Sequence, residues 1–216
     1  MGIFSFYPGK NLGAYGDGGA IVTNNEKLAE ACRMYANHGR LDKYNHQFEG
    51  VNSRLDGIQA AVLNVKLKYL DKWNIARQEV AKLYEHKLGP YESIKLPEIR
   101  PEVTPVYHLY VILVEERKKL REYLYKNGIS TGIHYPIGLP FLKAYRRFNH
   151  KAEDFPRTYE YQKKVLSLPI YPELTKHSID YIAEKLINFR EGKLVESEKL
   201  ESNYSLTYKN KKGIPG

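Results

Sequence analysis

The sequence predicts an α/β chain that ends in a small α+β domain. Two runs rich in β-forming residues, 19–23 and 106–114, are each followed by a helical pattern of apolar residues. Asparagine, glycine or proline stands at the ends of those helical patterns, as helix boundaries require. The chain has 216 residues, of which 42% are hydrophobic, so it can form a packed core.

The first strand and helix are predicted from the start of this pattern. Residues 19–23 form a short β-rich run, and Asn24 or Asn25 can cap the helix that follows with a side-chain oxygen. The helix is expected to continue to about Asn37 and to end at His38-Gly39.

A long helical pattern comes next. Ser53 stands three residues before Asp56, a spacing typical of a capping box, and apolar residues then recur at helical spacing up to Leu88. Because the pattern is longer than most globular helices, it predicts either two helices that break near residues 71–74 or one long helix. Gly89-Pro90 ends it.

The remaining elements form the predicted α+β domain. After a loop with three prolines, residues 106–114 are apolar on both faces, which is typical of a buried strand. Helices are predicted over residues 117–127 and 176–190, and a strand over 129–133 after Gly128. The chain turns polar beyond Gly192, and a loose tail is expected there.

Composition limits the classes of function. The formal charge of +9 allows a nucleic-acid binder as an alternative, but the lysines are dispersed along helical patterns, which is typical of a solvated face. No apolar stretch or leader pattern suggests a membrane or export, so a cytoplasmic location is expected. The seven histidines lack zinc spacings, so no metal site is expected. The single cysteine, Cys32, is expected to be a small buried residue.

The most informative run is Ser5-Phe-Tyr-Pro-Gly-Lys10-Asn-Leu-Gly, which Gly16-Asp-Gly-Gly-Ala20 follows. It resembles the cofactor site of the DegT/StrS-like sugar aminotransferases, which have the pyridoxal-phosphate (PLP) transferase fold of type I. Further segments match in the same order, from about residue 3 to 190. They are Asn37-His-Gly-Arg40, Gly50–Ala61, Trp73-Asn-Ile-Ala-Arg77 and Gly132-Ile-His-Tyr-Pro136.

The resemblance implies roles for six residues. Lys10 is expected to be the catalytic lysine that binds PLP covalently, Ser5 to bind its phosphate, and Asn52 to reach that phosphate from a neighbouring subunit. Substrate contacts are expected from three further residues, Arg54, His134 and Tyr135. Five of them have a purely structural alternative: an exposed lysine for Lys10, a local turn bond for Ser5, a helix start for Asn52 and Arg54, and a strand end for His134.

Members of this family are much longer, so the chain is expected to be the C-terminal half of such an enzyme. It then comprises the end of the large PLP-binding domain (residues 1–75), the small domain (76–192) and a polar tail (193–216). The resemblance implies transamination of a nucleotide-linked keto-sugar, with the keto group at position 3 and glutamate as donor, by a homodimer with shared sites. The alternative is a catalytically incomplete fragment with a scaffolding or regulatory role. Without its front half, the first strand is expected to lack neighbours and the chain to self-associate.

Overall fold

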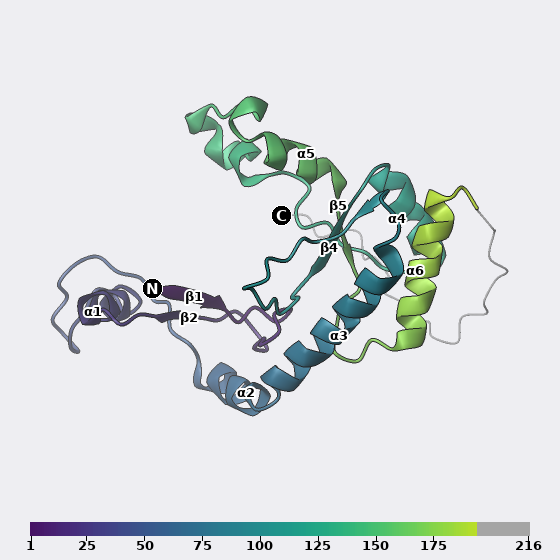
Figure 1. The fold of residues 1–216 in the computed structure, drawn as a ribbon. Coiled ribbons are helices and arrows are strands. Elements are labelled where there is room, and N and C mark those ends of the chain that lie inside the picture. The colour runs from purple at the N-terminus through teal and green to yellow at the C-terminus, as the bar shows by residue number, and fades with distance from the viewer. Residues whose placement is uncertain (194–216) are drawn as a thin grey trace, which may run out of the picture.

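The N-terminal strands form a two-stranded ribbon in the computed structural model, which describes residues 1–193. Strand β1 (Gly2–Ser5) pairs antiparallel with β2 (Gly19–Val22), so that Ile3 lies opposite Ile21. The expectation that the strand at 19–23 lacks neighbours is therefore wrong, because the chain's own first residues supply one. Figure 1 shows this ribbon and helix α1 (Glu26–Tyr35) extending away from the rest of the chain.

The predicted cap of α1 is confirmed. The Asn25 side chain accepts a hydrogen bond from the Leu28 backbone amide at 3.1 Å, which satisfies one of the free donors of the first turn. After the helix, His38 and Gly39 both have positive φ, 61° and 71°. A side chain at Gly39 would also collide with the Phe48 carbonyl, so glycine is required at this turn.

The long helical pattern forms two helices, α2 (Gly57–Leu67) and α3 (Leu70–Leu88). They meet at Lys68 and Tyr69, a few residues before the break predicted from the sequence. The predicted capping box is wrong: the residue before the first helical position is Asp56, and its side chain makes no capping bond.

A three-stranded antiparallel sheet lies at the centre of the C-terminal part, in the order β3-β4-β5. Its strands are β3 (Ile94–Lys95), β4 (Tyr110–Val114) and β5 (Val165–Leu168). The predicted strand at 129–133 is wrong. Only Gly132 pairs there, through a single bridge to Ser167, because the segment passes the outer edge of β5 instead of running along it.

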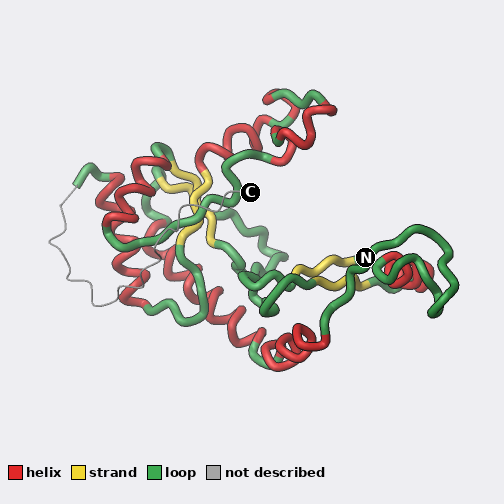
Figure 2. Tube along the Cα trace, turned by 180° about the vertical axis from the view of Figure 1, so that it is seen from behind, coloured by secondary structure: helices red, strands yellow, loops and turns green. Residues whose placement is uncertain are grey.

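Helix α3 and two later helices lie on one side of this sheet (Figures 1 and 2). Helices α4 (Arg117–Lys126) and α6 (Lys176–Arg190) agree with the sequence prediction within one residue, whereas α5 (Pro156–Lys164) was not predicted. Three short 3₁₀ helices precede α5, over Leu139–Phe141, Lys143–Phe148 and Ala152–Asp154. The predicted tail, 193–216, lies outside the described residues from 194 onward.

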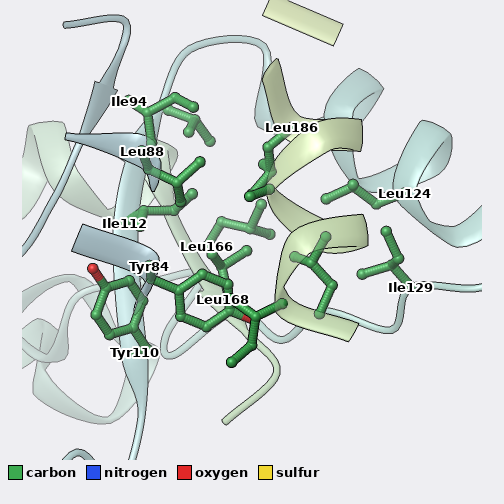
Figure 3. Packing of buried hydrophobic residues seen from close by; sticks show 14 of the residues in the cluster. Tyr84, Leu88, Ile94, Tyr110, Ile112, Leu124, Ile129, Leu166, Leu168 and Leu186 are labelled. Atoms are coloured by element: carbon green, nitrogen blue, oxygen red, sulfur yellow. The ribbon is translucent and has the colours of Figure 1, made fainter. Parts of the chain in front are cut away.

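The hydrophobic core joins α3, α4 and α6 to the sheet (Figure 3). Alternate residues of β4, namely Tyr110, Ile112 and Val114, are almost completely buried and face these helices. The Tyr84 ring of α3 stacks on Tyr110 with ring centroids 5.0 Å apart, and its hydroxyl donates to the Pro169 carbonyl at 3.0 Å. This core is the rigid base on which the segment before β4 is held.

Over residues 1–193, no helix combines the length and apolar character that crossing a bilayer demands. Cys32 is free and only half-buried, so the expectation that it is a buried residue is wrong.

Candidate functional site

Lys10 lies in a tight loop that connects β1 to β2. The Lys10 amide donates to the Tyr7 carbonyl at 2.8 Å, and the Ala14 amide donates to the Phe6 carbonyl at 2.8 Å. The Lys10 side chain is half-buried. These backbone bonds order the loop.

Gly13 lets this loop fold back on itself. A Cβ atom at Gly13 would collide with the Pro8 carbonyl, although the φ angle of Gly13 is not positive. Gly13 is therefore needed for a close approach of backbone and not for a positive φ. The close neighbour is the loop's own backbone.

Helix α2 supports the far side of the loop. The Tyr15 amide donates to the Gln59 side-chain oxygen at 2.8 Å. The Lys66 ammonium donates to the Gly13 carbonyl and lies 5.6 Å from the centre of the Tyr15 ring, within range of a cation–π interaction.

Asn11 ties the Lys10 loop to two segments that are distant in sequence. Its Nδ2 atom donates to Asn74 Oδ1 on α3 at 2.8 Å and to the Val106 carbonyl at 2.7 Å. Figure 1 shows the loop after β1 beside the segment that leads into β4. The Asn11 bonds therefore fix the position of Lys10 relative to the packed core.

The segment before β4 is itself held by α3. Arg77 donates through Nη1 to the Tyr107 carbonyl at 3.1 Å and to the Ile170 carbonyl at 2.9 Å. Tyr107 has a positive φ of 41°, and its hydroxyl donates to Glu85 at 3.1 Å. Burial, with Glu85 as the second cause, raises the pKa of Tyr107 to about 12. A non-glycine residue with positive φ is strained, and these bonds keep it in place beside His108.

His108 lies near Lys10 and two further basic side chains, Arg77 and His134. Burial lowers its pKa, and the positive charges of Lys10, Arg77 and His134 lower it further, in that order. Its Nδ1 atom is buried without a hydrogen-bond partner among the described residues. The four basic groups create a positive field, which suits an anionic ligand.

His134 and Tyr135 flank this group at an exposed turn. The His134 Nδ1 atom lies 2.8 Å from the Ser167 hydroxyl oxygen, while Tyr135 is 71% exposed. Their rings meet edge to face, with centroids 5.5 Å apart. Of the residues predicted from the sequence, Lys10 and His134 thus share one electrostatic neighbourhood, that of His108.

Ser5 ends β1, and its hydroxyl accepts a hydrogen bond from the Tyr7 amide at 3.3 Å. This is the local turn bond that the sequence left open as an alternative. The exposed serine keeps lone pairs and its own proton for another partner, so this bond leaves a phosphate role possible.

Asn52 and Arg54 lie elsewhere, on a groove of about 1400 Å³ beside the ribbon. Both are exposed, and Asn52 forms a backbone bridge with Asn37. Apolar side chains of both strands line the same groove, whereas Lys10 does not line it. The structure therefore separates these two residues from the Lys10 neighbourhood within one chain.

The family is decided by comparison with known proteins. The model of the DegT/DnrJ/EryC1/StrS aminotransferase family matches residues 1–187. The chain belongs to this family. The predicted resemblance is therefore confirmed over most of the sequence.

Individual relatives of the family agree. The chain is 45% identical over 173 residues to the dTDP-3-amino-3,4,6-trideoxy-alpha-D-glucose transaminase of Streptomyces venezuelae, a match that covers 80% of this chain and 46% of the relative. DesV of S. venezuelae, solved with a ketimine intermediate, superposes with a TM-score of 0.84 at 42% identity, over 88% of this chain and 51% of DesV. NtdA of Bacillus subtilis, solved with bound cofactor PMP, superposes with a TM-score of 0.77 at 31% identity, over 88% of this chain and 45% of NtdA. The chain spans about half the length of these aminotransferases.

Sequence reasoning assigned no role to four residues that build this site, Asn11, Asn74, Arg77 and His108. The first three lie inside segments already matched to the family, but a motif does not state which side chains meet. A signal for His108 was present, since it is an ionisable residue inside the apolar run 106–114. Over residues 1–193, three or more His, Cys, Asp or Glu side chains nowhere gather in a way that could hold a metal ion.

Proposed function

We propose that this chain contributes the lysine and the small domain of a PLP-dependent aminotransferase that acts on a nucleotide-linked 3-keto sugar, with glutamate as the amino donor. The observation that carries the proposal is the position of Lys10: Asn11 bonds hold its loop against Asn74 and Val106, next to the basic group around His108. Family membership supports transamination, and the relative that makes a 3-amino sugar supports the keto position.

The residues near Lys10 fit such a cofactor. Two buried polar atoms, Asn11 Oδ1 and His108 Nδ1, have no partner among the described residues, and buried polar groups are normally hydrogen-bonded. Lys10 would hold PLP covalently and Ser5 would bind its phosphate, with Asn52 contributing from a second copy of the chain. Bound there, PLP would supply an electrophilic carbon and an electron sink.

The chain's own groups carry out the remaining work. The Lys10 amine, held by its ordered loop, transfers a proton at the carbon that gains or loses the amino group. The positive charges of Arg77 and Lys10 attract an anionic substrate. His134 and Tyr135 lie at the exposed edge of this region, where they can orient the sugar, and Arg54 supplies a substrate contact from the second copy.

We also propose a homodimer with shared sites. The separation of Asn52 and Arg54 from Lys10 within one chain supports it, because residues on the groove can then serve the partner's site. The cytoplasmic location stays a prediction.

A second candidate is a scaffolding or regulatory fragment that does not catalyse. The large groove beside the ribbon supports this alternative, since its apolar lining is open to solvent and a surface of this kind marks a binding site for another polypeptide.

Covalent labelling separates the two candidates. The chain is mixed with PLP and reduced with borohydride, which traps the cofactor on the lysine it has joined, and the labelled peptide is identified by mass spectrometry. We expect the label on Lys10 in preference to the exposed Lys68. Before reduction, the visible absorbance of bound PLP should be lost in Lys10→Ala but not in Lys68→Ala. Equal labelling of the two lysines would contradict the first candidate.

A further inference from the structure

Ser167 contacts the His134 segment at three points. Its amide donates to the Gly132 carbonyl at 2.8 Å, and its carbonyl accepts from the Gly132 amide at 3.0 Å. Its hydroxyl oxygen lies 2.8 Å from His134 Nδ1. Ser167 is 4% exposed and lies in the middle of β5, opposite Val111 of β4. The sheet therefore fixes the atoms that His134 meets.

The direction of the hydroxyl bond follows from the available acceptors. Among the described residues, His134 Nδ1 is the one hydrogen-bond partner that the Ser167 hydroxyl has. A buried hydroxyl left without an acceptor for its proton costs about 1–3 kcal/mol. Ser167 therefore donates to Nδ1, and a neutral imidazole that accepts at Nδ1 carries its proton on Nε2.

Gly132 provides the space for the imidazole ring. A Cβ atom built on Gly132 would lie 2.6 Å from His134 Cε1 and 3.2 Å from Nδ1. The φ angle of Gly132 is not positive, so its backbone conformation is open to any residue. A side chain at this position would instead displace the ring of His134, which lies against the backbone.

We propose that Ser167 is a positioning residue for His134: its hydroxyl, with the space at Gly132, holds the imidazole in one orientation with the proton on Nε2. The exposed ring then offers a fixed hydrogen-bond donor beside the basic group around Lys10. This deepens the proposed function, on which it rests for the identity of the ligand. The Nε2–H group suits a carbonyl, hydroxyl or phosphate oxygen of the sugar nucleotide, because a neutral donor binds oxygen without requiring a charge.

The test is a long-range ¹H–¹⁵N NMR spectrum of the histidine rings in the full chain. It is recorded about two pH units above the ordinary histidine pKa of ~6.5, so that the imidazole is neutral. In the parent chain we expect His134 Nε2 to carry the proton and Nδ1 to show the shift of a nitrogen that accepts a hydrogen bond. In Ser167→Ala, the Nδ1 signal is expected to move to the value of a free acceptor, and the other tautomer to become populated.

Rescue and control variants separate positioning from a structural role. Ser167→Thr retains the hydroxyl on a residue that strands favour, so it is expected to restore the parental Nδ1 signal. Gly132→Ala is expected to displace the ring and change the His134 signals even with Ser167 present. Ser130→Ala, at an exposed serine of the same segment, is expected to change nothing.

Two results would overturn the inference. One is a spectrum of the parent chain that shows the proton on His134 Nδ1. This result does not depend on the folding of any variant. The other is an unchanged Nδ1 signal in Ser167→Ala. Because neither PLP nor substrate is present, failure of Lys10 labelling leaves this result intact, and the two proposals can fail separately.

Discussion

The N-terminal half of this chain, which contains the ribbon, and the C-terminal half, which contains the sheet, differ in how far their apolar residues are exposed. In the C-terminal half, α3, α4, α6 and the sheet enclose a continuous buried cluster. In the ribbon, Ile3 and Ile21 are 77% and 51% exposed, although they lie directly opposite one another on paired strands. Among residues 1–67, the buried hydrophobic residues are Ala14 and Leu63. The second half therefore stabilises itself, whereas the first half presents an apolar surface that another polypeptide can cover.

The lysine belongs to the half with little core. Asn11 connects its loop to the half that has one, so the geometry of the site depends on a few hydrogen bonds between the halves. Changes in the core, in the ribbon and at this connection should therefore have different consequences.

The largest expected effect is in the core. Ile112→Ala removes a fully buried side chain of β4 and should lower the free energy of unfolding by about 2–5 kcal/mol. Ile21→Ala, on an exposed strand position, should change it by less than about 0.5 kcal/mol. Urea unfolding followed by circular dichroism measures both. Equal losses would mean that the ribbon is as well packed as the core.

Self-association should depend on the ribbon. The chain is expected to associate in sedimentation experiments through the groove face, which Ile21 helps to line. Ile21→Lys removes burial of an isoleucine worth about 1.5–3 kcal/mol, so its dissociation constant should rise about tenfold or more. Tyr125→Lys, at an exposed position on α4, is the control. A parent chain that stays monomeric at high concentration contradicts this expectation.

Loss of the Asn11 bonds should loosen the lysine loop alone. Asn11→Ala removes the donor to Asn74 and Val106, which should lower the free energy of local opening by about 1–3 kcal/mol. Hydrogen exchange of residues 6–19 should become faster while that of α6 is unchanged. Asn64→Ala, at an exposed position on α2, should leave both unchanged. Uniform acceleration across the chain would show that Asn11 acts on the whole fold.

The smallest expected effect is electrostatic. Burial and the nearby charges of Lys10, Arg77 and His134 lower the pKa of His108, so Lys10→Met should raise that pKa toward the ordinary value of ~6.5. Lys68→Met, at an exposed lysine between α2 and α3, is the control. NMR titration measures the shift, and an unchanged His108 pKa in Lys10→Met would mean that the two groups are not neighbours.

The same shift predicts the sign of a pH dependence. The folded chain binds the His108 proton less tightly than the unfolded chain does. The stability contributed by neutral His108 is therefore fully present above the ordinary pKa and is lost as the pH falls through the lowered one. His108→Gln should reduce this loss of stability on acidification, which thermal unfolding at several pH values measures.

Elements with strong local signals were predictable. Asn25 caps α1 as its side chain suggests, and α4 and α6 lie within one residue of their predicted ranges. The strand at 129–133 was wrong because its residues favour β structure, yet the edge of β5 accepts only Gly132. Strand β5 was missed because its four residues, Val165–Leu168, are too few to distinguish from a helix segment, and the polar Ser167 interrupts their apolar pattern.

In the candidate site too, some features could be predicted from neighbouring residues and others could not. The motif around Lys10 could be found because its residue types follow one another in the sequence. The connections of Asn11 to Asn74, of Arg77 to Tyr107 and of His134 to Ser167 could not be found in that way.

The sequence by itself determined the family, the motif that contains Lys10 and the helices whose ends have their own caps, because these depend on neighbouring residues. Only the tertiary structure decided that Asn11 meets Val106 and that the Ser167 hydroxyl lies against His134. Such contacts join segments tens of residues apart, and their geometry is fixed by sheet pairing and core packing rather than by local preference.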